Sequence, residues 1–475
     1  MDFDCTVSDS KSKEFRKYLE NTGTNEVITS SLMKLYQEPE LPEDSIAYIR
    51  KQLATDEYPD YDEILSMRSR IAKLRTEKEK TRLQLSAAKS NVKMSEEEAE
   101  EYLSMKFEAL DNDPNAQSLL KEFLDEEILA DLRNRKTKLR GTLLDNIRCG
   151  LVEYEHKIGI FASDQYAYET FDLLYVPVLE EVHEVEQTDE TDEATTVGTP
   201  SAATLAVTAT SADSVNTRSH PELDWGLLED IVDLDPSNLF VKNVSITIGR
   251  ALENVRFMPT ITFEEVQDVG DKIQKVLEGI VDEEFVGKYY EFSDIKGEQK
   301  AKWIEEGILF DDPNNKFLKA AGTYSLWPLG RGLFLNEKKN IRVWVNEEEH
   351  LQVTSFNTGG NLREIYERLV KFMDFLDDLE FARDSRWGFA AHNLKNIGNT
   401  MRIVMKVKIP QLASPEKISI FESLADANDL VFKNLGCGLI EMTNKKRFGI
   451  TEFDTVKKFQ AAYAEIIDAE KCLYT

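Results

Sequence analysis

The apolar positions of the first 54 residues follow the spacing of helices. They form three stripes: Phe15, Tyr18 and Leu19; Val27, Ile28, Leu32, Leu35 and Tyr36; and Ile46, Ile49 and Leu53. Gly23 can end the first helix, and Pro39 and Pro42 break the chain before the third. We therefore predict a compact unit of three helices over residues 9–54.

The next stretch, residues 62–92, is rich in Lys, Arg and Glu and contains neither Gly nor Pro. Its apolar residues have the alternating spacing of three and four that coiled coils use, and they are Ile64, Met67, Ile71 and Leu74. Lys78 and Thr81 interrupt this seam. We predict a coiled-coil or helical segment that seeks a partner helix, with a solvated helix face over residues 73–82 as the alternative.

Three further regions differ in composition. Residues 97–183 are mainly helical by pattern, with Asp113-Pro114 as a natural helix start. Residues 184–222 are acidic and rich in Thr, Ala and Ser with hardly a bulky side chain, which predicts a disordered linker. Beyond residue 236 short β-rich runs alternate with amphipathic helices, which predicts an α+β domain. The expected strands are 240–248, 333–334, 341–345, 351–356 and 401–409.

Composition narrows the function classes. The 475 residues carry a formal net charge of −30, which argues against nucleic acid or an anionic membrane surface as partner. No apolar run is long enough to span a membrane, and the acidic N-terminus lacks the core of a secretory signal. Four scattered cysteines and five histidines argue against a disulfide framework or a metal site. We expect a cytoplasmic protein that holds no metal.

Four motifs near the C-terminus carry a family resemblance. Residues 327–332 are WPLGRG, 345–351 are VNEEEHL, 396–402 are NIGNTMR, and 444–452 are NKKRFGITE. In this order they resemble the WPTGRG, NEEDHL, NLGTTxR and NKRRxGLTE motifs of the phosphagen (ATP:guanidino) kinases, the family of arginine and creatine kinases. The resemblance implies an α+β, glutamine-synthetase-like catalytic domain with an antiparallel sheet over residues 236–473.

The resemblance extends upstream. The runs TLLD at 142–145, CGL at 149–151 and IGIFA at 158–162 are similar to the small all-α N-terminal domain of arginine kinases. The two regions, 97–183 and 236–473, cover about two thirds of the chain.

The first residues resemble a different family. KEFRKYLE at 13–20 and LYQEPE at 35–40 are similar to the QFRRYLE and LYEEPEKP of the c-Myc-binding protein. That family is a small helical adaptor followed by a coiled-coil tail, and it is associated with A-kinase anchoring proteins and with cilia and flagella. The resemblance implies a multidomain chain that binds A-kinase anchoring or axonemal proteins through residues 1–95, in a cilium or flagellum.

The phosphagen kinase resemblance also locates the nucleotide site. Phosphagen kinases surround the phosphates of Mg-ATP with arginines, whose planar forks match phosphate oxygens. The two arginines of the family's STRVRCGR fall at Ser245 and Thr247, and the arginine after NEEDHL falls at Gln352. A family histidine falls at Gly307, whereas the arginine of NLGTTxR is retained as Arg402.

The later family loop, RGTRGEHTE, aligns with the shorter KNLGCGLIE at 433–441, which lacks both its phosphate arginine and its substrate carboxylate. Four of the five expected phosphate arginines are thus absent. Because a charge-assisted hydrogen bond is worth roughly 1.5–3 kcal/mol, their loss predicts weaker nucleotide binding by orders of magnitude. The basic residues that could compensate are Lys242, Arg250, Lys395 and the run 445–447.

On the substrate side, Glu348 occupies the position of the carboxylate that orients the guanidinium and can accept its proton. Asn393 stands where the family has a cysteine, and an asparagine cannot supply a thiolate. The substrate-recognition SGV of the N-terminal domain corresponds to Cys149, Gly150 and Leu151.

Each candidate also has a structural interpretation. Glu348 can be a retained acid without function, and Arg402 can form an internal salt bridge instead of binding phosphate. We expect His350 to pack and hydrogen-bond within the fold, and His392 to be a core or surface residue.

We hypothesise a phosphagen kinase-fold pseudoenzyme that serves as a structural or anchoring component, with no cofactor. The alternative is a divergent, active phosphotransferase that transfers the γ-phosphate of Mg-ATP to a guanidine. A third hypothesis is a nucleotide sensor that binds Mg-ADP through Arg402 and nearby lysines.

Overall fold

The computed structural model describes residues 9–39, 41–42, 44–53, 65–71, 73–75, 78, 81, 94–183 and 225–474. The chain divides into two units, residues 1–86 and 87–475. The predicted linker at 184–222 and much of the predicted helical segment at 62–92 lie outside the described residues.

The first unit includes the helices α1 (Asp9–Asn21), α2 (Thr24–Gln37) and α3 (Ser45–Leu53), and residues 65–71 and 73–75 of the same unit are also helical. This confirms the three predicted helices. Gly23 adopts a left-handed φ of 66° at the turn between α1 and α2, a conformation that glycine takes without strain. The large apolar side chains described in α1, α2 and α3 are at least partly exposed, and Ser31 is the one buried residue among those described there.

The second unit begins with an all-α domain, as predicted. Its helices are α5 (Glu96–Asn112), α6 (Leu119–Phe123), α7 (Glu126–Leu132), α8 (Leu143–Ile147), α9 (Ala167–Thr170) and α10 (Asp172–Val182). Capping boxes begin α5 at Ser95 and α8 at Thr142. The predicted helix start at Asp113-Pro114 is wrong: the Asp113 amide donates to the Leu110 carbonyl and ends α5.

The C-terminal domain is built on an eight-stranded antiparallel sheet in the order β2-β3-β4-β5-β1-β8-β10-β9. Its strands are β1 (Val241–Arg250), β2 (Gly287–Glu291), β3 (Gly332–Asn336), β4 (Ile341–Val345), β5 (Leu351–Thr358), β8 (Met401–Lys408), β9 (Leu430–Gly436) and β10 (Leu439–Asn444). A small second sheet pairs β6 (Arg383–Asp384) with β7 (Gly388–Phe389). All the predicted strands are present, and the antiparallel sheet is confirmed.

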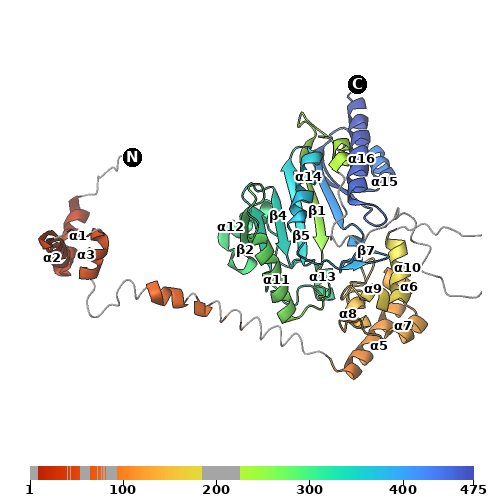
Figure 1. The fold of residues 1–475 in the computed structure, drawn as a ribbon, viewed down its shortest axis with the longest axis horizontal. Coiled ribbons are helices and arrows are strands. Elements are labelled where there is room, and N and C mark those ends of the chain that lie inside the picture. Colours follow the sequence, from red (N-terminus) through yellow and green to blue (C-terminus); the bar gives the residue numbers. More distant parts are fainter. Residues whose placement is uncertain are drawn as a thin grey trace, which may run out of the picture. The chain divides into compact units, whose positions relative to one another are not determined.

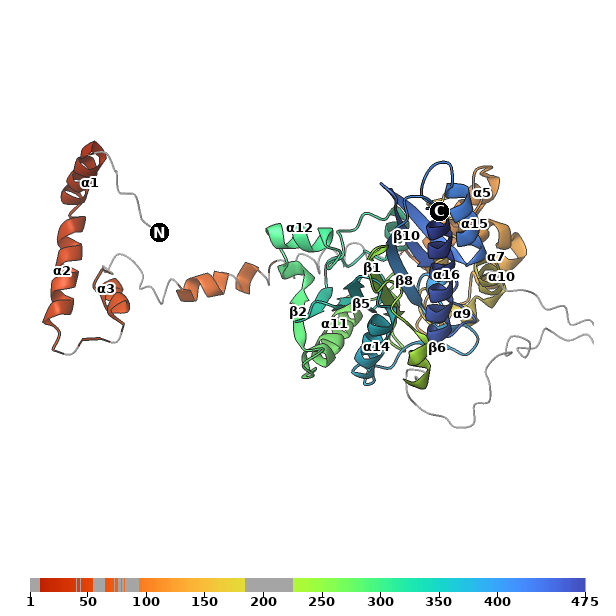
Figure 2. The same ribbon diagram turned by 90° about the horizontal axis from the view of Figure 1, so that it is seen from above.

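One face of this sheet is apolar and covered by helices. Alternate residues of β1, such as Val244, Ile246 and Ile248, are buried in the main core. The covering helices are α11 (Phe263–Glu278), α14 (Leu362–Asp374), α15 (Ile418–Ala427) and α16 (Glu452–Cys472). Figure 2 shows α11, α14 and α16 on the same side of the sheet.

The opposite face differs along its width. Over β3 and β4 it carries an aromatic cluster that includes Phe292, Phe310 and Trp344, together with Trp303 of α12 (Gly297–Glu305). Over β1, β5 and β8 it carries polar side chains, namely Ser245, Thr247, Gln352, Thr354 and Arg402, joined by Arg342 of β4. We call these six residues the polar sheet face. The remaining short helices are α13 (Lys316–Ala321), η1 (Trp225–Asp230), η2 (Phe292–Asp294) and η3 (Leu394–Asn396).

The two domains of the second unit share a core. Figure 1 shows helices α5 to α10 gathered in one group beside the sheet. Their apolar cluster continues into the C-terminal domain through Phe257, Trp387, Leu394 and Ile397. The all-α domain therefore packs directly against the loop that carries His392 and Asn393.

Candidate functional site

The centre of the polar sheet face is one row of paired residues. Arg342 lies opposite Thr354, Thr354 opposite Thr247, and Thr247 opposite Arg402. Directly opposite residues of antiparallel strands have their side chains on the same face. The hydroxyl oxygens of Thr247 and Thr354 lie 2.9 Å apart and form a hydrogen bond. The position of an expected phosphate arginine is thus held by a neutral hydroxyl that already has a partner.

On either side of this row, Ser245 and Gln352 are uncharged at positions where the resemblance implies arginines. Ser245 lies opposite Phe356 and Val404. The side-chain amide of Gln352 donates to a Glu347 carboxylate oxygen at 3.2 Å. Neither side chain can supply the positive charge that a phosphate group requires.

Arg402, the retained arginine, is exposed on this face. Its guanidinium makes no ion pair or hydrogen bond with any residue that the structure describes. The internal salt bridge that we considered is therefore not formed. Its positive charge contributes, after burial, to the lowered pKa of both Arg342 and Arg447.

Arg342 is a residue that the motif comparison missed. Its guanidinium donates to the carbonyl oxygen of Gly307, where the family histidine was expected, and lies 4.8 Å from the ring centre of Trp344. Burial, and then the charge of Arg402, lower the pKa of Arg342 to about 10. The alternation of β4 could have placed Arg342 beside Trp344, but the contact with Gly307 could not have been foreseen.

The predicted pair Glu348 and Asn393 is brought together in the structure. The Asn393 side-chain amide donates to a Glu348 carboxylate oxygen at 2.9 Å. The Nε2 atom of His392 lies 3.9 Å from the same oxygen. A neutral amide thus orients the carboxylate where the resemblance implied a thiolate.

The two acids beside Glu348 hold less negative charge than their sequence suggests. Burial, and then the charge of Glu348, raise the pKa of Glu347 to about 7. Burial likewise raises the pKa of Glu349 well above its ordinary value, and one of its carboxylate oxygens has no hydrogen-bond partner among the described residues. Near neutral pH, Glu347 and Glu349 therefore offer a guanidinium less negative charge than two fully ionised carboxylates would.

The two histidines near these acids differ in their surroundings. His350 accepts a hydrogen bond from the Leu252 amide through Nδ1 and bonds the Arg256 carbonyl through Nε2, both at 2.9 Å, as its predicted structural role requires. His392 is fully buried with its ring 5.4 Å from that of Phe161, and neither ring nitrogen has a hydrogen-bond partner in the described chain. Burial lowers the pKa of His392 to about 4, so the ring is neutral.

The three expected substrate residues lie in the all-α domain and are buried. Cys149 packs with Phe161, Leu318 and Ala321, the last two from α13, and burial raises the pKa of its thiol to about 12. The Gly150 amide donates to the Gly159 carbonyl at 2.9 Å, and Leu151 is a core residue. All three residues are packed within the core, and none of them presents a charged side chain.

The later loop is a tight hairpin. Strands β9 and β10 pair directly across the turn Cys437-Gly438, and the Lys408 ammonium donates to the Cys437 carbonyl. No segment long enough to cover the polar sheet face is present between these two strands, which the structure describes in full.

Several basic residues that could compensate are already engaged. The buried Arg250 donates to Thr400 at 2.6 Å, pairs with Glu452 at 3.4 Å and lies 3.5 Å from the ring centre of Phe389. Arg447 donates to the Asn396 side chain and to the Lys395 carbonyl.

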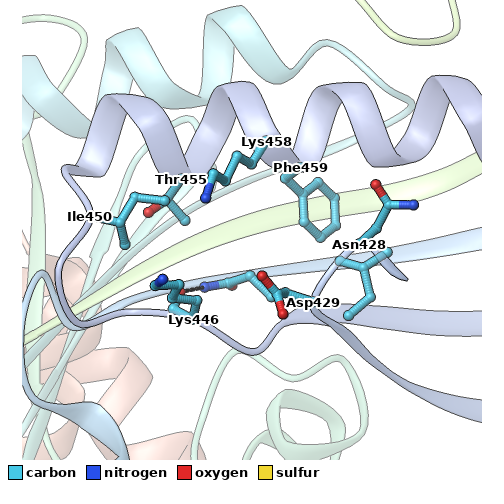
Figure 3. Close-up of a pocket in the computed structure, with 9 residues that line it drawn as sticks. Asn428, Asp429, Lys446, Ile450, Thr455, Lys458 and Phe459 are labelled. Atoms are coloured by element: carbon cyan, nitrogen blue, oxygen red, sulfur yellow. Dashed lines mark hydrogen bonds between the residues drawn. The ribbon is translucent and has the colours of Figure 1, made fainter. Parts of the chain in front are cut away.

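Lys446 lies in a separate pocket between α16 and the loop before it (Figure 3). The pocket is lined by Asn428, Asp429, Leu430, Asn444, Lys446, Ile450, Thr455, Lys458 and Phe459. It contains none of the residues of the polar sheet face and neither Glu348 nor Asn393.

Comparison with known proteins identifies the fold and the family. Residues 114–180 match the N-terminal domain of the ATP:guanido phosphotransferases, and residues 268–473 match their C-terminal catalytic domain. Residues 9–91 match the c-Myc-binding protein family. No helix among the described residues is long and apolar enough to cross a membrane.

Individual relatives agree with these matches. An arginine kinase of Limulus polyphemus is 30% identical over 373 residues, which cover 77% of this chain and 96% of that protein. A duplicated taurocyamine kinase of Schistosoma mansoni superposes with a TM-score of 0.66 at 28% identity, over 78% of this chain and 48% of that one. A lombricine kinase, at 23% identity, shares the fold with a TM-score of 0.64 over 76% and 93% of the two chains.

The match to the duplicated kinase thus spans about half of that protein, whereas the match to the arginine kinase spans nearly all of it. The motifs at 327–332, 345–351, 396–402 and 444–452 lie within the matched catalytic domain. The chain belongs to the ATP:guanido phosphotransferase (phosphagen kinase) family, with a c-Myc-binding-protein-like helical region at its N-terminus.

Proposed function

We propose that this chain is a pseudoenzyme with a phosphagen kinase fold, and that it acts as a structural or anchoring component of a cilium or flagellum. The observation that carries the proposal is the polar sheet face. Thr247 is bonded to Thr354 and Gln352 to Glu347, so that Arg402 is the one exposed cation among its six residues. Phosphoryl transfer depends on several positive groups that neutralise the transferring phosphate, and a single arginine does not provide them.

The surrounding arginines support this proposal. Arg342 lies in the same row as Arg402 but is half-buried, and its guanidinium donates to the Gly307 carbonyl. Arg250 and Arg447 are held by the contacts described above. Recruiting any of them to a phosphate would break contacts within the fold, so their binding energy would be offset by that loss.

The acceptor side supports it as well. Asn393 holds Glu348 in place but adds no negative charge next to it. A guanidinium would therefore meet one charged carboxylate there instead of a carboxylate and a thiolate.

A phosphotransfer assay tests the absence of catalysis. The full-length chain is incubated with Mg-ATP and, in turn, arginine, creatine, taurocyamine and lombricine, and ADP formation is followed. We expect no ADP formation that depends on the guanidine, and the same baseline for Glu348→Gln. Turnover that disappears in Glu348→Gln would overturn the proposal in favour of a divergent active phosphotransferase.

Introducing arginines at the three altered positions tests whether their loss explains the expected absence of catalysis. The variant Ser245→Arg/Thr247→Arg/Gln352→Arg is expected to show saturable Mg-ADP binding below millimolar nucleotide, which the unaltered chain lacks, since each charge-assisted hydrogen bond is worth roughly 1.5–3 kcal/mol. Ser419→Arg/Ser423→Arg, which adds arginines on the exposed side of α15, is the charge control. Equal affinity of the restored variant and the control would contradict the assignment of these positions.

The anchoring role rests on the N-terminal region. We propose that residues 1–95 bind an amphipathic helix of an A-kinase anchoring or axonemal protein. Phe15 and Tyr18 of α1 support this, because both rings are exposed and stack with centres 6.5 Å apart.

A capture experiment from an axonemal fraction tests this role. We expect anchoring or axonemal proteins to be retained by the full-length chain and lost with Phe15→Glu/Tyr18→Glu. Val281→Glu, at an exposed position of the second unit, is the control. Recovery of no such protein, or equal recovery with the double variant, would count against the anchoring role.

A further inference from the structure

Among the described residues of 9–53, no apolar side chain is fully buried, so the helices α1, α2 and α3 lack a hydrophobic core of their own. The exposed apolar residues in this range are Phe15, Tyr18, Val27, Ile28, Leu32, Met33, Tyr36, Leu41, Ile46 and Leu53. Among the residues of this unit that the structure describes, Ser31 alone is buried. A unit of this size needs a disulfide, a metal or a partner chain to offset its conformational entropy.

The exposed residues of α2 and α3 lie on definite sides of the two helices. Ile28, Leu32 and Tyr36 recur every four residues along α2, and Ile46 and Leu53 are seven apart on α3, so each set forms a stripe. The two helices pack as an antiparallel hairpin, because Lys34 donates to the Gln52 side chain at 3.3 Å while Tyr48, earlier on α3, donates to Glu38, later in the chain than Lys34. The hairpin therefore presents apolar stripes that it does not bury.

We propose that a second copy of this chain covers these stripes, and that two α2–α3 hairpins form a four-helix bundle with two-fold symmetry. Paired hairpins would bury both sets of stripes in one core, which a single hairpin cannot do. The helix α1 is not needed for this bundle. Phe15 and Tyr18 therefore stay available to the anchoring partner proposed above, and neither proposal depends on the other.

Charge favours a second copy as the occupant. Residues 24–53, which contain the hairpin, carry three Lys or Arg and five Asp or Glu, a net charge of −2, whereas the whole chain carries −30. Two copies can thus meet at this unit without the repulsion that opposes contact between other surfaces of such an acidic chain.

The helical segment that follows gives an independent argument. Residues 65–71 and 73–75 are helical, and Met67, Ile71 and Leu74 are exposed at a spacing of four and three. This spacing is typical of a coiled-coil seam, and identical helices pair along such a seam in parallel and in register. A bundle formed by the hairpins would bring the two segments together at high effective concentration.

The charges beside this seam limit how strongly the segment can pair by itself. In the heptad register set by Met67 and Leu74, Arg70 of one copy lies across from Arg75 of the other, and these like charges repel. The segment is therefore suited to extend a dimer that the hairpins hold, rather than to form one alone.

The molar mass of the purified full-length chain in solution tests the proposal. One chain has a mass of 54.4 kDa, so light scattering at micromolar concentration should give about twice this value for the unaltered protein. Leu32→Glu/Ile46→Glu should give the mass of one chain, since both residues lie on the stripes. Val281→Glu, an exposed apolar residue of the second unit, should leave the mass unchanged. A single-chain mass for the unaltered protein, or a dimer that persists in Leu32→Glu/Ile46→Glu, would overturn the proposal.

Cross-linking tests the arrangement within the dimer. In a background with Cys5, Cys437 and Cys472 replaced by serine, Leu74→Cys should form a disulfide between two chains under mild oxidation. Ser69→Cys, on the outer side of the same heptad, should not. Equal cross-linking at both positions, or none at position 74, would contradict parallel pairing of the segment.

Discussion

The buried imidazole of His392 is a residue-scale feature with a measurable cost. A buried polar atom without a hydrogen bond destabilises a fold by about 1–3 kcal/mol. We predict that His392→Phe raises the unfolding temperature of the chain, because a phenyl ring removes both unpaired nitrogens and can pack against Phe161. His350→Phe is the matched control and should lower it, since both nitrogens of His350 are bonded. A lower unfolding temperature for His392→Phe would contradict this account.

The same residue makes stability depend on pH. Burial lowers the pKa of His392 from 6.5 to about 4, so the folded chain binds this proton more weakly than the unfolded chain. The free energy of unfolding is therefore not reduced by His392 protonation above pH 6.5, and it falls by up to about 3 kcal/mol as the pH drops toward 4. We predict that the difference in unfolding free energy between His392→Phe and the unaltered protein widens from pH 7.5 to pH 5. A constant difference would show that His392 does not titrate as described.

At the residue scale, the sequence predicts which residue stands at each motif position, but it does not predict which other residues that side chain contacts. Ser245, Thr247 and Gln352 could be placed by their distance from retained motif residues. The raised pKa of Glu347 and the position of Arg342 could not, because both depend on burial by segments far away in the chain.

At the scale of elements, the loop that carries Cys149, Gly150 and Leu151 is fixed by backbone packing. A Cβ atom added to Gly150 would lie 2.6 Å from a Leu120 methyl group and 2.7 Å from the Gly159 carbonyl oxygen. We predict that Gly150→Ala lowers the stability of the chain by about 1–3 kcal/mol through overpacking. Gly249→Ala is the control, because its Cβ would meet only Glu349 Cγ at an ordinary 3.6 Å. Equal unfolding temperatures for the two variants would contradict this packing.

Helices and strands whose apolar residues recur at a regular spacing could be predicted from the sequence, whereas strands without such a spacing could not. The strands β2, β9 and β10 were not expected. The exposed Lys433 and Asn434 give β9 little apolar alternation, and the hairpin depends on the positive φ of Gly436 and Gly438. Asp113-Pro114 has the composition of a helix start because proline favours the first helical turn, yet the next helix, α6, begins with Ser118 as its cap.

At the scale of the whole molecule, the motifs that reveal the family are largely structural. Arg331 is fully buried and donates to the Thr323 carbonyl at 3.0 Å. The Asn346 side-chain amide donates to the carbonyls of Val266 and Gly330. These contacts hold the fold together without any ligand, which is why the family could be predicted from sequence even though Ser245, Thr247 and Gln352 stand where the resemblance implies arginines. The motif residues Arg331 and Asn346 therefore serve the fold, whatever the chain binds.

The central claim, that this fold no longer holds a nucleotide, is tested most directly by calorimetric titration of Mg-ATP and Mg-ADP into the full-length chain. We predict no saturable heat up to millimolar nucleotide, because Arg402 is the one exposed cation of the polar sheet face. Saturable binding at micromolar nucleotide that Arg402→Ala abolishes would contradict the claim and favour a nucleotide sensor or an active kinase.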